Sequence, residues 1–281
     1  MLIIETKSDL QKAVLSLKNE DKTIGFVPTM GSLHEGHISL IDIAHKHSNI
    51  VICSIYINPT QFNDKKDFEL YPTNVENDIK MLEKAGCDIV FIPDTKAIYP
   101  NGIESINYDL GDLANVMEGK HRKGHFNGVI QVVKRLFDIV NPNIAVFGKK
   151  DFQQLAVINW MVNHFNLDIK IIGAPIVRDF DGLALSSRNA RLSKNERVVA
   201  LNLYKSLTNI FNNYKTTPLS ELKTQEIVRL SKIDNLELEY LEIADKHTLQ
   251  SVLNLNNSKS LSVFIAAKVG NVRLIDNVGL F

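Results

Sequence analysis

The stretch TIGFVPTMGSLHEGHISLIDIAH, residues 23–45, decides the fold class of this chain. Residues 24–27 are apolar, which is typical of a buried strand, and a loop containing Gly31 follows them. Apolar residues such as Ile38 and Ile41 then recur at helical spacing. The stretch therefore predicts a strand, a tight loop and a helix, which is the unit from which parallel α/β sheets are built.

Two histidines, His34 and His37, stand where this loop becomes the helix. A helix N-terminus favours anions, because its first N–H groups have no partner within the helix and the helix dipole is positive there. Gly31 and Gly36 let the backbone pass close to a ligand, since neither carries a Cβ atom. A metal site would need a Cys or acidic partner at a recognised spacing, which is absent, and a solvated loop is the other alternative. The pattern favours a phosphate site.

The composition of the chain excludes several classes of protein. Its 281 residues include 32 basic and 32 acidic side chains, so no excess charge points to nucleic acid or to a membrane surface as a partner. We see no signal-peptide pattern and no apolar run long enough to span a membrane. Cys53 lies in an apolar run and Cys87 follows a glycine, so they form no disulfide scaffold. We therefore expect a cytoplasmic protein.

Strand-like and helix-like stretches alternate from the N-terminus to about residue 175. The run 50–57 is continuously apolar, as expected of a parallel strand buried on both faces. This alternation predicts an α/β fold with a Rossmann-like parallel sheet. The later helix patterns and apolar runs predict a smaller α/β C-terminal domain with antiparallel strands. We therefore expect two domains, residues 1–177 and 178–281.

Two capping-box patterns mark the expected starts of helices. Ser8 is followed three residues later by Gln11, and Ser193 by Glu196. In a capping box the first side chain accepts a hydrogen bond from a backbone N–H group of the first helical turn. We therefore expect one helix to begin at each of these serines.

Polar residues follow two of the predicted strands. Ligands of open parallel sheets bind beyond the carboxyl ends of the strands, so Gln61 in the string NPTQF (58–62) is placed to contact a substrate. An exposed loop glutamine is the alternative. Gly148-Lys149-Lys150-Asp151 stands at a strand end before a helix, which is typical of phosphate binding. The Walker A spacing is absent, and Asp151 also suits a helix N-cap.

A second candidate anion site lies in the string LALSSRNARLS, residues 183–193. Ser186 and Ser187 supply hydroxyl donors, and Arg188 supplies a planar, permanently charged fork that suits phosphate. A pair of helix-capping serines with a surface arginine is the alternative. The residues alone do not separate these two interpretations.

Four strings, taken together, resemble the pantoate–β-alanine ligase family of the nucleotidylyltransferase superfamily. They are PTMGSLHEGHISLI (28–41), NPTQF (58–62), FGKKDFQQL (147–155) and SSRN (186–189). The resemblance implies ATP-dependent condensation of (R)-pantoate with β-alanine through a pantoyl adenylate, with release of AMP and pyrophosphate. It also implies a homodimer that uses Mg²⁺ bound through the phosphates rather than by protein side chains. A related nucleotidylyltransferase with another acceptor, or a non-catalytic nucleotide-binding protein, is the alternative.

The resemblance also implies roles for individual residues. The catalytic residues would be His34, His37, Lys150 and Arg188. The ATP-binding residues would be Met30, Gly31, His34, Gly36, His37, Gly148, Lys149, Lys150, Asp151, Val177, Leu185, Ser186, Ser187 and Arg188. Pantoate and β-alanine would contact Met30, Gln61 and Gln154.

Two further expectations concern the same resemblance. The SSRN string corresponds to a loop that closes over the triphosphate, so we expect the C-terminal domain to act as a lid. The segment EGKHRKGHFNG (118–128) resembles a family motif and would serve either the site or a dimer interface. Thr73 and Lys123 depart from the family, which usually has Arg and Pro at these positions.

Overall fold

The structure, a computed structural model, describes residues 1–104, 106–254 and 260–281. The chain forms two compact units. The first consists of Met1–Leu110, Arg122–Lys149 and Gln154–Pro175, and the second of Gly111–His121, Lys150–Gln153 and Ile176–Phe281. The second unit therefore includes two short segments that precede residue 177, where we expected the first domain to end.

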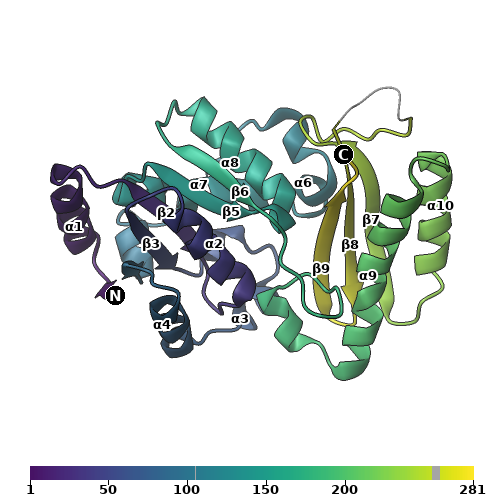
Figure 1. Cartoon of the computed structure of the whole chain (residues 1–281), viewed down its shortest axis with the longest axis horizontal. Coiled ribbons are helices and arrows are strands. Elements are labelled where there is room, and N and C mark those ends of the chain that lie inside the picture. The colour runs from purple at the N-terminus through teal and green to yellow at the C-terminus, as the bar shows by residue number, and fades with distance from the viewer. Residues whose placement is uncertain (105, 255–259) are drawn as a thin grey trace. The chain divides into compact units, whose positions relative to one another are not determined.

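The first unit is built on a six-stranded sheet with the order β1-β4-β3-β2-β5-β6 (Figure 1). All neighbouring strands run parallel, which confirms the Rossmann-like sheet. The strands are β1 (Leu2–Ile4), β2 (Ile24–Thr29), β3 (Ile50–Ile55), β4 (Ile89–Phe91), β5 (Ile144–Gly148) and β6 (Lys170–Ala174).

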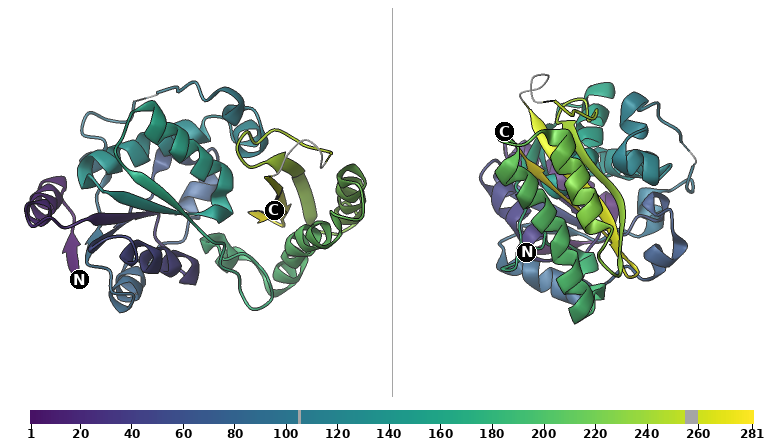
Figure 2. Two further views of the ribbon diagram at one scale, coloured as in Figure 1. Left: turned by 45° about the horizontal axis from the view of Figure 1, so that its top comes forward. Right: turned by 90° about the vertical axis from the view of Figure 1, so that its right-hand side faces the viewer.

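Helices lie on both sides of this sheet (Figure 2). They are α1 (Lys7–Asn19), α2 (Glu35–His45), α3 (Lys65–Glu69), α4 (Val75–Lys84), α5 (Thr95–Ile98), α7 (His125–Val140) and α8 (Phe152–His164). Two consecutive residues of β2 show why residues 24–27 are apolar. Phe26 packs edge-on against Phe137 of α7, whereas Val27 joins the core cluster that contains Leu40 and Ile41 of α2. Each face of the sheet therefore has its own apolar cover.

The helix starts test the two predicted capping boxes. Ser193 and Glu196 form theirs, since the serine Oγ accepts from the backbone N–H of Glu196 and the carboxylate accepts from that of Ser193. At α1 the prediction was wrong, because Thr6 rather than Ser8 is the N-cap. Its Oγ1 accepts from the backbone N–H of Asp9 at 3.2 Å.

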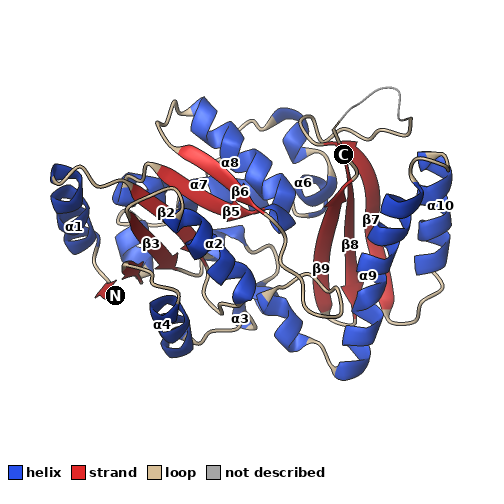
Figure 3. Cartoon of the chain, in the orientation of Figure 1, coloured by secondary structure: helices blue, strands red, loops and turns tan. Residues whose placement is uncertain are grey.

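The second unit contains a three-stranded antiparallel sheet, as expected (Figure 3). Its elements are α6 (Met117–His121), α9 (Lys194–Asn213), α10 (Leu219–Leu230), β7 (Leu236–Asp245), β8 (Leu261–Val269) and β9 (Val272–Gly279). Val263 and Ile265 of β8 share an apolar core with Leu203 and Leu207 of α9. The side chain of Phe264 points to the opposite face of the sheet, where its ring centroid lies 5.4 Å from that of Phe152. The short segments 111–121 and 150–153 belong to this unit because they contact its sheet.

Among the residues that the structure describes, no helix is both long enough and apolar enough to cross a membrane. Both cysteines are buried and carry free thiols. Cys53 lies in β3, as expected of a residue in an apolar run, and Cys87 lies just before β4. Burial raises the pKa of the Cys53 thiol well above its ordinary value and that of Cys87 to about 12.

We predict that neither thiol reacts with Ellman's reagent in the native protein at pH 8, and that both react in denaturant. The unfolded thiol of Cys87 ionises near pH 9, whereas the folded one stays protonated to about pH 12. The free energy of unfolding should therefore fall as the pH rises from 9 towards 12, and this fall should be smaller in Cys87→Ala. Rapid labelling of the native protein at pH 8 would contradict the prediction.

Candidate active site

The loop between β2 and α2 has an unusual backbone conformation. Gly31 has φ +78° and Ser32 has φ +51°, both in the left-handed region. A Cβ atom at residue 31 would lie 3.0 Å from a carboxylate oxygen of Asp78 and 3.0 Å from a methyl carbon of Ile55. A side chain at residue 31 is therefore disfavoured by both conformation and space.

Asp78 of α4 holds this loop. Its carboxylate, on a residue only 1% exposed, accepts the backbone N–H groups of Ser32 and Leu33, each at 2.7 Å. Our reading of the sequence missed this residue. The sequence could have indicated this residue, because it stands four positions before the inward-facing Leu82. A carboxylate at that position lies on the buried side of the helix.

The two histidines lie at the start of α2, where the sequence placed them. His34 is the N-cap, and its carbonyl oxygen accepts the N–H of His37 at 2.7 Å. The imidazole rings are stacked with centroids 4.0 Å apart. The backbone N–H of His34 donates to Nδ1 of His37 at 3.3 Å. Neutral His37 therefore carries its proton on Nε2, from which it can donate to an anion.

Gln61 and Met30, both expected to contact pantoate, lie together in the first unit. Gln61 is in the 3-10 turn η1 (Pro59–Gln61) and is 9% exposed. Its Nε2 donates to the sulfur of Met30 at 2.8 Å, and its Oε1 accepts from Asn58 at 3.3 Å. A thioether is a weak acceptor, so a hydroxyl or carboxylate oxygen would bind this buried amide group more strongly.

Side chains from two other parts of the chain hold the η1 turn. The hydroxyl of Tyr99 donates to Oδ1 of Asn58 at 2.8 Å, and Nδ2 of Asn58 donates to the carbonyl of Gly128 at 3.1 Å. Nδ1 of His125 lies 2.7 Å from the carbonyl oxygen of Gln61. Burial raises the pKa of Tyr99 to about 12, so its donor proton is retained at neutral pH. Residues 125–128 therefore support Gln61, a role that the sequence left undecided.

The strand end at Gly148 leads into the 3-10 turn η3 (Lys149–Asp151). In the second unit, the ammonium group of Lys150 lies 3.8 Å from a carboxylate oxygen of Asp151. Gln153 and Gln154 have different surroundings. Gln153 is buried and uses its amide within the unit, accepting from the N–H of Glu118 and donating to main-chain carbonyls. Gln154 is only half-buried, and its contact with a substrate stays a prediction.

The SSRN segment begins a further 3-10 turn, η4 (Ser187–Arg191). Ser186 is its N-cap, with Oγ accepting from the N–H of Arg188 at 3.3 Å, so the capping interpretation holds for this serine. The N–H of Leu185 donates to the carbonyl of Val177 at 3.0 Å, which closes the intervening loop. Capping by Oγ leaves the Ser186 hydroxyl proton for another acceptor, so phosphate binding is compatible with this geometry.

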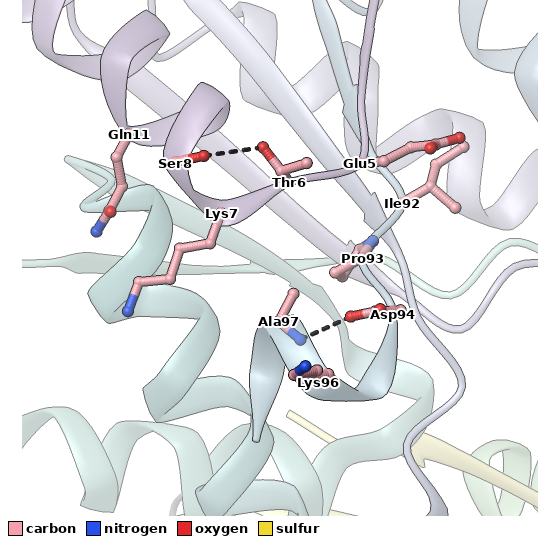
Figure 4. Close-up of a pocket in the computed structure, with 10 residues that line it drawn as sticks. All are labelled: Glu5, Thr6, Lys7, Ser8, Gln11, Ile92, Pro93, Asp94, Lys96 and Ala97. Atoms are coloured by element: carbon pink, nitrogen blue, oxygen red, sulfur yellow. Dashed lines mark hydrogen bonds between the residues drawn. The ribbon is translucent and has the colours of Figure 1, made fainter. Parts of the chain in front are cut away.

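The described residues contain no group of three or more His, Cys, Asp or Glu side chains that could hold a metal ion. An open pocket of the first unit lies where β1 and β4 end (Figure 4). None of the predicted site residues lines it. Two of its polar side chains, Thr6 and Asp94, cap α1 and α5. We therefore assign this pocket no part in the site.

Comparison with known proteins decides the family. The pantoate–beta-alanine ligase family model matches residues 2–279. The chain belongs to the pantoate–β-alanine ligase family. A pantothenate synthetase of Porphyromonas gingivalis is 46% identical over 284 residues, covering 99% of each chain. The resemblance read from the motifs is thus confirmed.

Two solved structures of the family agree with the fold. The crystal structure of pantothenate synthetase from Thermus thermophilus has a TM-score of 0.94 and 35% identity, and the match covers 100% of both chains. A pantoate–beta-alanine ligase from Francisella tularensis, complexed with beta-gamma ATP and beta-alanine, has a TM-score of 0.83 and 37% identity. That match covers 100% of this chain and 98% of the other.

The packing of α7 against η1 gives a direct test of the Gln61 site. A Cβ atom at Gly128 would lie 2.4 Å from the carbonyl oxygen of Thr60 and 2.8 Å from the backbone nitrogen of Gln61. Gly128→Ala must therefore displace the turn, and we expect the KM for pantoate to rise about 10-fold or more while the KM for ATP changes little. Steady-state kinetics measure both constants.

Asp138→Ala, on the exposed side of the same helix, is the control and should leave both constants unchanged. A folded Gly128→Ala variant with an unaltered KM for pantoate would show that Gln61 does not bind this substrate.

Proposed function

We propose that this chain catalyses ATP-dependent condensation of pantoate with β-alanine, giving pantothenate, AMP and pyrophosphate. Family membership across residues 2–279 carries the proposal. The histidine pair at the start of α2 and the buried amide of Gln61 beside Met30 support it, because they supply donors for a phosphate and for a small polar acid.

In the first half-reaction the pantoate carboxylate attacks the α-phosphorus of ATP, and the bond to the β-phosphate oxygen breaks. Two anions must approach each other, so the protein has to offset their repulsion. The groups proposed for this are His34, His37, Lys150, Ser186, Ser187 and Arg188. The Nε2–H group of His37 is suited to donate to a phosphate oxygen, since its Nδ1 already accepts from the backbone.

Other residues would hold the adenosine part and the loops around the phosphates. By family resemblance, Asp151 binds the ribose and the backbone of Val177 contacts adenine. The remaining proposed contacts with ATP come from Met30, Gly31, Gly36, Gly148, Lys149 and Leu185. Gly31 suits this role because the loop backbone is open to a ligand where no Cβ atom intervenes.

In the second half-reaction the amine of β-alanine attacks the acyl carbon of the adenylate, and AMP leaves. The mixed anhydride hydrolyses if water reaches it, so positioning of the amine and exclusion of water are the main requirements. Gln61, Gln154 and Met30 are proposed to hold the pantoyl group. Neither cysteine serves as a covalent nucleophile in this scheme, and both thiols are buried.

The proposal includes Mg²⁺ held through the phosphates of ATP. The site residues are mainly Lys, Arg, His and hydroxyl donors, which suit phosphate oxygens better than they suit Mg²⁺. When bound, the cation would neutralise part of the charge that develops on the leaving pyrophosphate.

Three further expectations stay proposals. They are a homodimer, a cytoplasmic location, and a division at residue 177 with 178–281 acting as a lid. If the lid exists, ATP and pantoate together should slow hydrogen exchange in residues 178–193. Equal exchange with and without both ligands would count against it, and light scattering of the purified protein decides the oligomeric state.

The function is tested by following both half-reactions. We expect pyrophosphate release from ATP to require pantoate, and AMP release to require β-alanine as well. A transferase with another acceptor would release no pyrophosphate with pantoate, and a non-catalytic protein would bind ATP without turnover.

His37 provides the matching residue test. His37→Ala should slow single-turnover adenylate formation by about two to four orders of magnitude, because a donor to the transition state is lost. The control is His45→Ala, at the exposed C-terminal end of the same helix, which should retain the wild-type rate. A near-normal rate in folded His37→Ala would remove His37 from the mechanism.

A further inference from the structure

A buried ion pair in the second unit lies beside two of the proposed phosphate-binding segments. Asp276 of β9 is 5% exposed, and its two carboxylate oxygens accept from the guanidinium of Arg178 at 2.6 and 2.9 Å. The guanidinium lies over the ring of Tyr204, with 4.1 Å between the central carbon and the ring centroid. The bidentate contact and this ring fix the arginine in one orientation.

The remaining contacts of this pair run to main-chain atoms. Arg178 also donates to the carbonyls of Gly182 and Asn277, each at 3.2 Å. The side chain of Asn277 donates from Nδ2 to the carbonyl of Lys150 at 2.9 Å. We call Arg178, Asp276 and Asn277 the β9 network. It ties the backbone of Lys150 to the loop that leads to Ser186.

These elements also enclose a common space. Lys150, Ser186, Asn189 and Asp276 are among the residues that line one cavity of about 10 Å³. This volume is at the lower limit for a single water molecule, so no layer of solvent separates them. The amide of Asn189 donates to the carbonyl of Ala184 at 3.0 Å, which stiffens the same loop.

A purely stabilising role explains the network poorly. The unit has a separate apolar core between α9, α10 and the sheet. Buried ion pairs are weak contributors to stability, and apolar replacements are often neutral or better. The β9 network instead contacts main-chain atoms close to groups that we assign to phosphate binding. Small displacements of such groups slow catalysis strongly.

We propose that Asp276 and Asn277 are positioning residues for the adenylation half-reaction. They hold the backbone of Lys150 and the 178–188 loop at the distance from each other that is needed to bind the triphosphate. The inference rests on the proposed function and adds two residues to it, neither of which touches a reacting atom.

The test separates the two half-reactions in the full-length protein. Asn277→Ala removes the bond to Lys150 but keeps the main-chain carbonyl that accepts from Arg178. We expect single-turnover adenylate formation to slow about 10- to 100-fold. Amide formation from saturating pantoyl adenylate and β-alanine involves no β- or γ-phosphate, so its rate should stay within about twofold of the wild-type rate. Asp276→Asn, which removes the negative charge, should likewise slow adenylate formation and leave the rate of amide formation nearly unchanged.

Glu226→Gln is the matched control. Glu226 is a carboxylate of the same unit, 3% exposed, that bonds to Ser206, Asn209 and Arg229 rather than to the β9 network. Any loss in this variant should affect both half-reactions equally. Equal losses in Asn277→Ala, or no loss, would overturn the inference. Absence of pantoate-dependent pyrophosphate release in the wild-type protein would instead reject the proposed function.

Discussion

The carboxylate of Asp78 is the contact on which the loop before the histidine pair depends. The left-handed backbone conformation of Ser32, which is not a glycine, is costly, and a buried carboxylate without donors is costly as well. The two costs offset each other, because the turn at Gly31 and Ser32 directs two backbone N–H groups at the carboxylate of Asp78. The start of α2, and with it the stacked histidine pair, follows from this one arrangement.

The same principle recurs wherever the protein supports a group that we assign to substrate. His125 contacts the carbonyl of Gln61, and Asn277 contacts the carbonyl of Lys150. In both cases a buried polar side chain holds the main chain of the functional residue and leaves its side chain to other contacts. Backbone anchoring restricts the chain more than side-chain pairing would, because a peptide group is rigid.

Features with a local cause could be predicted from the sequence. The strand and helix around the histidines follow from apolar spacing, and the start of α9 follows from Ser193 and Glu196. The start of α1 shows the limit of such reasoning, because Thr6 with Asp9 and Ser8 with Gln11 offer similar local patterns. The hydroxyl of Thr6 also donates to the carboxylate of Asp9, which favours the earlier start.

Features that depend on contacts between residues far apart in the chain could not be predicted from local sequence patterns. Asp78 meets residues about 45 positions earlier, and Tyr99 meets Asn58 across 41 positions. No sequence pattern indicated that residues 111–121 belong to the second unit. It depends on Glu118, whose carboxylate pairs with Arg273, 155 positions later. Only the folded chain brings such pairs together.

Strand β9 has a consequence for the order in which the molecule can be completed. It carries Arg273 and Asn277, which hold segments near residues 118 and 150. A ribosome releases those early segments long before β9 emerges. All strands of the Rossmann-like sheet are therefore synthesised before β9, and the backbone around Lys150 acquires these anchors only afterwards. A chain that ends before β9 would therefore lack both the Arg273–Glu118 ion pair and the hydrogen bond from Asn277 to the carbonyl of Lys150.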